Sequence, residues 1–200
     1  MKTPRTRMIT ITTAVLLLCG ALPPPAAAQD TPAEYGAKRL FIHLGAAGLF
    51  SADPDFRDVY GSIAVMPEIK IGATILGPLH IWAGYGVFSQ RGTVPVIETE
   101  AKATQQFLSF GCGLGGRLSG RTFFRLDAGI VGIRFSEEAF GTDVTEGAQG
   151  ARLDAALNFV LSESLALEAA AGYLYGSDNI SSMTINLGGL KAGLGLTYRF

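Results

Sequence analysis

Residues 190–200 read LKAGLGLTYRF, and in this stretch apolar or aromatic residues alternate with polar residues and glycine. The apolar set starts at Leu190 and runs to Phe200, which is the last residue. A period of two indicates a β-strand whose two faces meet different surroundings. The ends of a soluble domain usually fray, but this strand keeps its alternation to the final aromatic residue. We therefore expect the C-terminal strand to be an integral part of a sheet.

The composition limits the class of protein. The chain has 200 residues, of which 48% are hydrophobic and 16% are charged, and 26 are glycine. This length fits one domain. The chain is too apolar for a disordered protein and too rich in glycine for a helical bundle.

The first residues have the layout of a secretory signal peptide. Basic residues at Lys2, Arg5 and Arg7 precede an apolar stretch, and three alanines end at Ala28. We expect cleavage after Ala28, so that residues 1–28 form the signal peptide and residues 29–200 form the mature domain. Cleavage removes three of the sixteen Lys and Arg residues, which leaves thirteen against 17 acidic residues. No nucleic-acid partner is expected of this charge balance.

The uncharged run 71–90 is long enough for a transmembrane helix, but its pattern is that of a hairpin. Gly77 and Pro78 lie at its middle, and the residues on both sides alternate with a period of two. Short turns recur at 117–121 and 162–164, and longer polar stretches fall between them. The sequence therefore predicts eight strands, at about 38–50, 60–75, 79–90, 105–118, 122–135, 148–161, 165–176 and 186–200, with loops at 51–59, 91–104, 136–147 and 177–185.

The two faces of these strands differ in an unusual way. One face carries large apolar side chains such as Leu108, Phe110 and Leu153, and the other carries glycines and a few charges. The second face is too small and too sparsely charged to coat a soluble protein, but it suits the inside of a narrow tube. The apolar face then meets lipid, as in a transmembrane β-barrel. We predict an all-β fold, a closed eight-stranded antiparallel up-and-down barrel, because closure lets every backbone group pair without water.

The inward charges form the candidate functional site. Four are acidic and four are basic, and we name them the interior charge ladder: Glu68, Lys70, Arg125, Asp127, Arg152, Asp154, Glu168 and Lys191. When the short turns are taken as hairpin centres, five of them face a glycine: Lys70 faces Gly84, Glu68 Gly86, Arg125 Gly115, Asp127 Gly113 and Asp154 Gly172. An eight-stranded barrel is just wide enough for side chains to fill it. A neutral plug is the favoured interpretation, and a path for protons or ions is the alternative.

Other candidate chemistry is weaker. The run 111–116 matches G-x-G-x-x-G, but it continues a strand instead of opening a helix, so it does not indicate a nucleotide site. His43 and His80 point inward by parity, and no Ser–His–acid set can be assembled. The acidic loops lack the spacing of a calcium loop. We therefore expect a non-enzymatic protein without catalytic residues, cofactor or metal.

Over residues 37–200 the chain resembles the small eight-stranded outer-membrane barrels of Gram-negative bacteria, the OmpA-type transmembrane domain and OmpX-like proteins. The signal peptide, the strand pattern and a terminal strand with Leu194, Leu196, Tyr198 and Phe200 carry the resemblance. It implies residence in the outer membrane, contact with lipid and lipopolysaccharide, and insertion by machinery that reads the terminal Phe as an assembly signal. It also implies a structural, adhesive or surface-interaction role, with an unknown extracellular partner at the four loops. A lipid-modifying enzyme and a small pore remain the alternatives.

Overall fold

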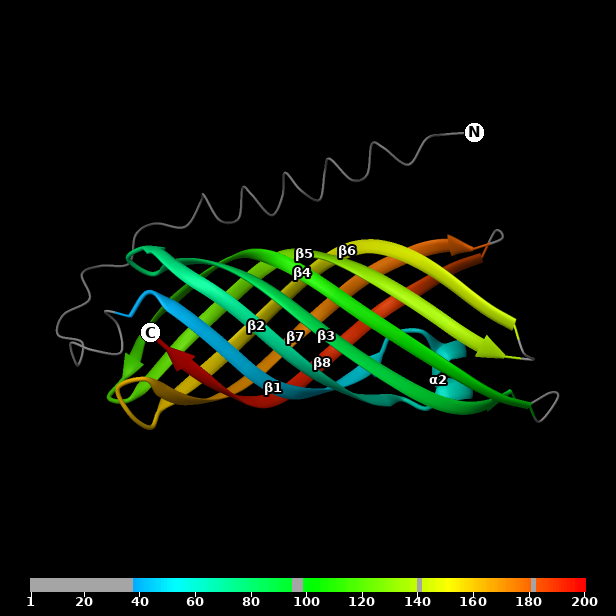
Figure 1. Cartoon of the computed structure of the whole chain (residues 1–200), viewed down its shortest axis with the longest axis horizontal. Coiled ribbons are helices and arrows are strands. Elements are labelled where there is room, and N and C mark those ends of the chain that lie inside the picture. Colours follow the sequence, from blue (N-terminus) through cyan, green and yellow to red (C-terminus); the bar gives the residue numbers. More distant parts are fainter. Residues whose placement is uncertain (1–37, 95–98, 140–141, 181–182) are drawn as a thin grey trace, which may run out of the picture.

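The computed structural model describes residues 38–94, 99–139, 142–180 and 183–200, and in them eight antiparallel strands close into a barrel (Figure 1). Each strand pairs with its neighbours in the sequence. The strands are β1 (Leu40–Ser51), β2 (Ile63–Leu76), β3 (Leu79–Val94), β4 (Thr99–Ser119), β5 (Thr122–Ala139), β6 (Thr142–Val160), β7 (Leu165–Ile180) and β8 (Met183–Arg199). The predicted signal peptide, residues 1–28, lies outside the described residues.

The last strand closes the barrel, as the sequence predicts. β8 pairs with β1 from Arg199 opposite Phe41 to Gly189 opposite Ser51. The backbone N–H of Phe200 donates to the carbonyl of Leu40 at 3.0 Å, so the pairing includes the final residue. The alternation of residues 190–200 is therefore the alternation of a strand with one face inside the barrel and one outside.

Three of the four predicted loops are wrong in extent. β3 runs to Val94 and β4 begins at Thr99, so most of 91–104 is strand. The same holds for 136–147, where β5 ends at Ala139 and β6 begins at Thr142, and for 177–185. Polar composition predicts loops here, but polar residues are compatible with paired strands wherever both strands continue beyond the lipid. We call this end, with its long strands, the outer end.

The remaining predicted loop, 51–59, contains a short helix, α2 (Pro54–Tyr60), which was not among the predicted elements. Asp53 caps it: its Oδ1 accepts from the N–H of Phe56 at 3.1 Å. Pro54 follows at the first helical position, and Gly61 ends the helix at a φ of 88°. An Asp–Pro pair of this kind is a recognised helix start, so the signal was present in the sequence. No helix in the described ranges is long and apolar enough to cross a membrane.

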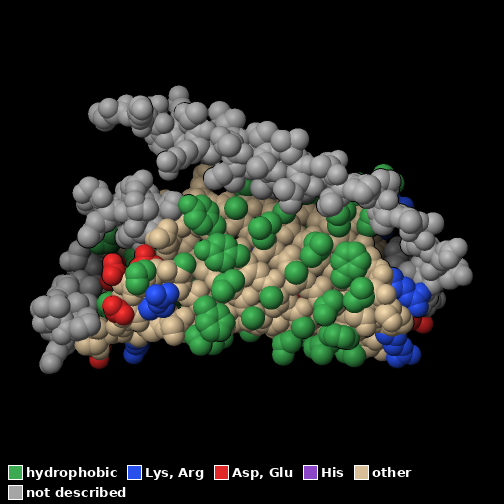
Figure 2. Space-filling model, turned by 180° about the vertical axis from the view of Figure 1, so that it is seen from behind, with side chains coloured by type: hydrophobic (Ala, Val, Ile, Leu, Met, Phe, Trp, Pro, Cys, Tyr) green, Lys and Arg blue, Asp and Glu red, His purple; other side chains and the backbone are tan. Residues whose placement is uncertain are grey.

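Exposure follows the predicted inversion. The side chains of Val65, Leu76 and Leu108 are 71%, 77% and 61% exposed, whereas charged Lys70 and Arg152 are 2% and 1% exposed. Figure 2 shows the result on one face: apolar side chains cover the middle of the barrel, and charged side chains gather at its two ends. Near the end with the short turns, the rings of Tyr198 and Phe200 pack edge to face, with centroids 4.9 Å apart. This apolar belt fits the hydrocarbon region of a bilayer.

Candidate functional site

The candidate site is the lumen of the barrel, and its polar part depends on the predicted glycine pairing. The structure confirms all five pairs: Gly84 opposite Lys70, Gly86 opposite Glu68, Gly115 opposite Arg125, Gly113 opposite Asp127 and Gly172 opposite Asp154. A Cβ atom on Gly172 would collide with Oδ1 of Asp154, and one on Gly113 with Oδ1 of Asp127. The glycines therefore provide the space in which the acidic side chains extend across the lumen.

The structure brings all eight residues of the interior charge ladder into one network. At its centre, Lys70 Nζ lies 2.6 Å from Asp127 Oδ2 and 3.1 Å from Asp154 Oδ2. Arg125 joins Asp127 to Glu168 through contacts of 3.0 and 2.8 Å. A charge buried at this depth is tolerable only when it is paired and hydrogen-bonded, and each of these groups has at least one partner of opposite sign.

The other half of the network is built around Arg152. Its Nε lies 2.7 Å from Asp154 and its Nη2 lies 2.8 Å from Glu68. Lys191 Nζ adds a second cation to Glu68 at 2.9 Å and lies 3.3 Å from Asp154 Oδ1. Trp82 closes one side, because Lys70 and Arg152 lie over its ring at 4.7 and 5.4 Å from the centroid. Four Lys and Arg residues thus balance four carboxylates.

Both histidines belong to this network and lie inside the barrel, as parity predicts. His80 Nε2 is 2.7 Å from Asp127 Oδ1. His43 Nδ1 is 3.2 Å from the hydroxyl of Thr197, which donates to Glu168 at 2.9 Å. A nucleophile–His–acid relay needs the imidazole between the hydroxyl and the acid, with one ring nitrogen toward each. Here one ring nitrogen, Nδ1 of His43, faces both the hydroxyl and Oε1 of Glu168, which lies 3.5 Å away, and the hydroxyl itself donates to the carboxylate, so the relay geometry is not formed at Thr197.

Beside the network lies a cavity of about 10 Å³, which is room for about one water molecule. His43, Glu68, Glu168 and Lys191 are among its lining residues. A single water can hydrogen-bond such polar walls.

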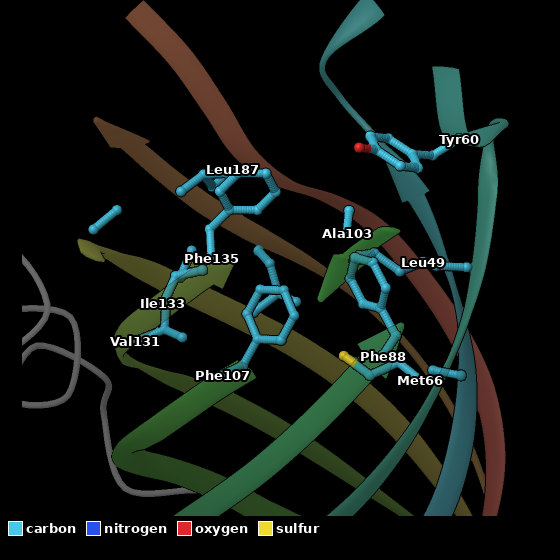
Figure 3. Close-up of a cluster of buried hydrophobic side chains, with 14 of the residues drawn as sticks. Leu49, Tyr60, Met66, Phe88, Ala103, Phe107, Val131, Ile133, Phe135 and Leu187 are labelled. Atoms are coloured by element: carbon cyan, nitrogen blue, oxygen red, sulfur yellow. The ribbon is translucent and has the colours of Figure 1, made fainter. Parts of the chain in front are cut away.

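An apolar layer, which the alternation alone does not predict, fills the lumen at the outer end. It consists of inward side chains from most strands, including Leu49, Met66, Phe88, Phe107, Ile133, Phe135, Leu174 and Leu187 (Figure 3). Phe107, Met66 and Leu174 are fully buried. Aromatic packing connects the layer to the mouth, since Phe88 lies 6.0 Å from Phe107 and 6.3 Å from Phe56 of α2 between ring centroids.

The sequence did carry a signal for this layer. Along β5 the outward residues change from apolar Leu126 and Ile130 to polar Arg134, while the inward residues change from Arg125 and Asp127 to Ile133. The apolar face thus switches from outside to inside. Such a switch is expected where a strand leaves lipid and its outer face meets water. It therefore marks the outer boundary of the apolar belt.

α2 covers the apolar layer at the mouth. Tyr60 is buried and its hydroxyl donates to Glu137 of β5 at 2.6 Å, while Oδ2 of Asp53 accepts from the N–H of Asn186 of β8 at 3.2 Å. Burial, together with the hydrogen bond to Glu137, raises the pKa of Tyr60 well above its usual range, so it stays a donor at physiological pH. The helix is thus held from two different strands.

Comparisons with known proteins place the fold. No protein-family model matches the sequence, and no curated protein matches it. Among solved structures, Neisserial surface protein A is similar at 15% identity and a TM-score of 0.63, over 80% of this chain and 97% of that one. OprG of Pseudomonas aeruginosa is similar at 12% identity and a TM-score of 0.66, over 83% of this chain and 98% of that one. The chain has the fold of the small eight-stranded outer-membrane β-barrels.

A third outer-membrane barrel, Ail, the attachment invasion locus protein of Yersinia pestis, is similar at 12% identity and a TM-score of 0.54, over 82% of this chain and 99% of that one. These neighbours are bacterial outer-membrane proteins, which is the location predicted from the sequence.

In the described part of the chain, no group of three or more His, Cys, Asp and Glu side chains could hold a metal ion.

Proposed function

We propose that this protein is a non-enzymatic, integral outer-membrane barrel with a closed lumen, which acts at its outer surface in a structural, adhesive or surface-interaction role. The observation that carries the proposal is the double filling of the lumen. The interior charge ladder occupies one level, and the apolar layer beneath α2 occupies the next. Ions that crossed the first level would still meet a layer of apolar side chains.

The two rival functions lack support from the geometry. A pore needs a continuous aqueous path, and an eight-stranded barrel has no width to spare once its side chains interdigitate. A lipid-modifying enzyme needs its catalytic groups at the lipid-facing surface. His43 and His80 are instead buried in the lumen at 3% and 4% exposure, and each is held by a carboxylate or hydroxyl of the network.

The outer end is the part of the molecule available to an extracellular partner. Several strands extend there beyond the apolar belt, and α2 lies across the mouth (Figure 1). Its exposed charges are of both signs: Asp55, Asp58, Glu100 and Glu138 stand beside Arg57, Arg91, Lys102 and Arg134. Ail has been solved in complex with the heparin analogue sucrose octasulfate, a polyanion. The mixed charges at the outer end of the present barrel do not favour a polyanion over other partners.

The terminal strand supports assembly as the role of Leu194, Leu196, Tyr198 and Phe200. All four side chains point outward and are at least 46% exposed, so they are accessible before the strand is embedded in lipid. We propose that the insertion machinery reads this face.

Three measurements test the proposal. Mature protein should stay in the membrane pellet after carbonate washing; release as a soluble protein would contradict membrane integration. Lipid A mass spectra from cells with and without the protein should be identical, and a mass change that depends on the protein would support the enzymatic alternative. Beads coated with host-surface polymers should retain cells that carry the protein. Retention should weaken when Asp55 and Asp58 are changed to Asn, and not when exposed Arg117 at the opposite end is changed to Gln.

A further inference from the structure

Positive charge is concentrated at the end of the barrel with the short turns, which we call the inner end. The start of β1, the turn between β4 and β5 and the end of β8 meet there (Figure 1). These segments carry five basic residues, which we name the inner basic rim: Lys38, Arg39, Arg117, Arg121 and Arg199. In the described residues, Glu163 is the one exposed acidic side chain at this end. The inner end therefore has an excess of positively charged side chains, whereas the outer end carries both signs.

The inner basic rim surrounds the mouth of the barrel instead of covering one side. The carbonyl of Arg39 accepts from a backbone N–H of β2 at 2.7 Å, which places Arg39 beside that strand. Lys38 Nζ donates to the hydroxyl of Ser164 in the turn between β6 and β7. Arg117 and Arg121 flank the turn between β4 and β5, across the barrel from β1 and β8. Lipids on several sides of the barrel therefore lie near a basic side chain.

The interior charge ladder does not neutralise the rim. Its four carboxylates are balanced by its own four Lys and Arg residues. The ring of Phe41 lies against both sets, because Arg125 of the ladder and Arg199 of the rim are 5.3 and 5.9 Å from its centroid. A ladder without net charge supplies no excess of negative charge to the inner end, so the rim keeps its excess of positive charge.

The level of the rim in the membrane follows from its apolar neighbours. All three short turns and both terminal strands carry a large apolar side chain at the inner end that is more than half exposed: Leu40, Leu76, Leu118, Leu161 and Phe200. The apolar belt thus reaches the turns themselves. Arg117 directly precedes Leu118, so its charge lies where hydrocarbon meets the lipid headgroups. Lys and Arg suit this level, because their stems cover apolar surface while the charged end stays in the polar region.

We propose that the inner basic rim binds anionic phospholipid headgroups of the inner leaflet in preference to zwitterionic ones. The short turns of such barrels lie on the periplasmic side, so the inner leaflet is the one that meets the rim. Phosphate is the anion at this level, and a guanidinium offers it two parallel N–H donors. In a zwitterionic headgroup an ammonium cancels the charge of the phosphate, which removes the long-range attraction. This inference goes beyond the proposed function and needs only that the barrel resides in a bilayer.

Spin-labelled lipids test the preference. Mature protein is reconstituted in phosphatidylcholine vesicles with a trace of spin-labelled phosphatidylglycerol or spin-labelled phosphatidylcholine, and electron paramagnetic resonance gives the fraction of each label that the barrel immobilises. Phosphatidylglycerol should associate about fivefold more strongly, the effect expected of one basic side chain beside each headgroup. The preference should vanish at about 1 M salt, where the screening length is about 3 Å. Equal association of the two labels at low salt would overturn the proposal.

Two paired variants locate the preference. Arg117→Gln with Arg121→Gln removes two exposed charges from the inner end and should lower the preference for phosphatidylglycerol. The matched control, Arg91→Gln with Lys102→Gln, removes two exposed charges that lie beyond the belt boundary at Arg134, and should leave the preference unchanged. Urea unfolding of both variants checks that the barrel is intact. An unchanged preference in the inner variant, or an equal loss in the control, would contradict a site at the inner basic rim.

Discussion

Removing Arg125 should destabilise the barrel because the Glu168 carboxylate then has no Lys or Arg side chain beside it. Within the described residues, Arg125 is the one Lys or Arg that contacts Glu168, at 2.8 Å, and the remaining partners of Glu168 are Thr197 and His43. Asp127, the other partner of Arg125, keeps Lys70 at 2.6 Å. Breaking one side of a buried ion pair typically costs about 3–5 kcal/mol. We therefore expect Arg125→Met to lower the free energy of unfolding by about that amount.

The double change Arg125→Met with Glu168→Gln should be more stable than the single change. Gln keeps the shape of Glu and can still bond to Thr197, but it carries no charge that needs a partner. The two substitutions should therefore couple by about 1–3 kcal/mol, the range found for residues in one network. As a comparison, Lys191→Met should cost less than Arg125→Met, because Glu68 keeps Arg152 at 2.8 Å.

Unfolding in urea, with the protein in lipid vesicles, measures these free energies. Trp82 is the only tryptophan of the chain, and it reports on the network because Lys70 lies over its ring. A loss below about 1 kcal/mol for Arg125→Met would mean that water already solvates the network, which weakens the case for a plug. A double variant less stable than the single one would refute the assignment of Glu168 as the group left unpaired.

Three further predictions concern other parts of the barrel. Deleting Phe200 should slow insertion by the purified assembly machinery while barely changing the stability of the inserted barrel, and equal insertion rates would argue against its role as a signal. Gly172→Ala should lower the free energy of unfolding by about 1–3 kcal/mol in the same urea assay, because the added methyl crowds the charge network. Gly132→Ala, whose added methyl has its nearest neighbour at 3.8 Å, should be tolerated. Similar costs for the two substitutions would refute the steric argument. Asp53→Ala should lose the cap of α2, worth about 1 kcal/mol, and should speed amide exchange in residues 54–60; unchanged exchange would show that the strands alone hold the helix.

The period of two made the barrel predictable from sequence. It assigns each residue to one of two faces, and the short turns then set the register, so the position of Lys70 opposite Gly84 follows from counting. The same parity predicts that Arg125 points inward. It does not predict that Arg125 contacts Glu168, because these residues lie on β5 and β7, and their contact depends on side-chain conformations across the lumen.

The outer end was less predictable because two solvents meet there. The rule that apolar residues face outward holds only inside lipid. Beyond the belt, Arg134 faces water while Ile133 packs inside, so a single rule for the whole strand misplaces the apolar layer. Polar composition also concealed the strand extensions, since paired strands in water tolerate polar side chains. The capping chemistry of Asp53 and Pro54 predicts the start of α2, but the polar composition of 51–59 favours a loop and conceals it.

Electrical recording tests the closed lumen most directly. Purified mature protein is inserted into a planar lipid bilayer, and the current is recorded at constant voltage beside a variant in which Phe88, Phe107 and Phe135 of the apolar layer are changed to Ala. The native barrel should show no steady open current, because the charge network and the apolar layer both block the path. The variant empties only the apolar layer, so it should also stay closed while the charge network remains intact. A steady, large conductance from the native protein would contradict the account.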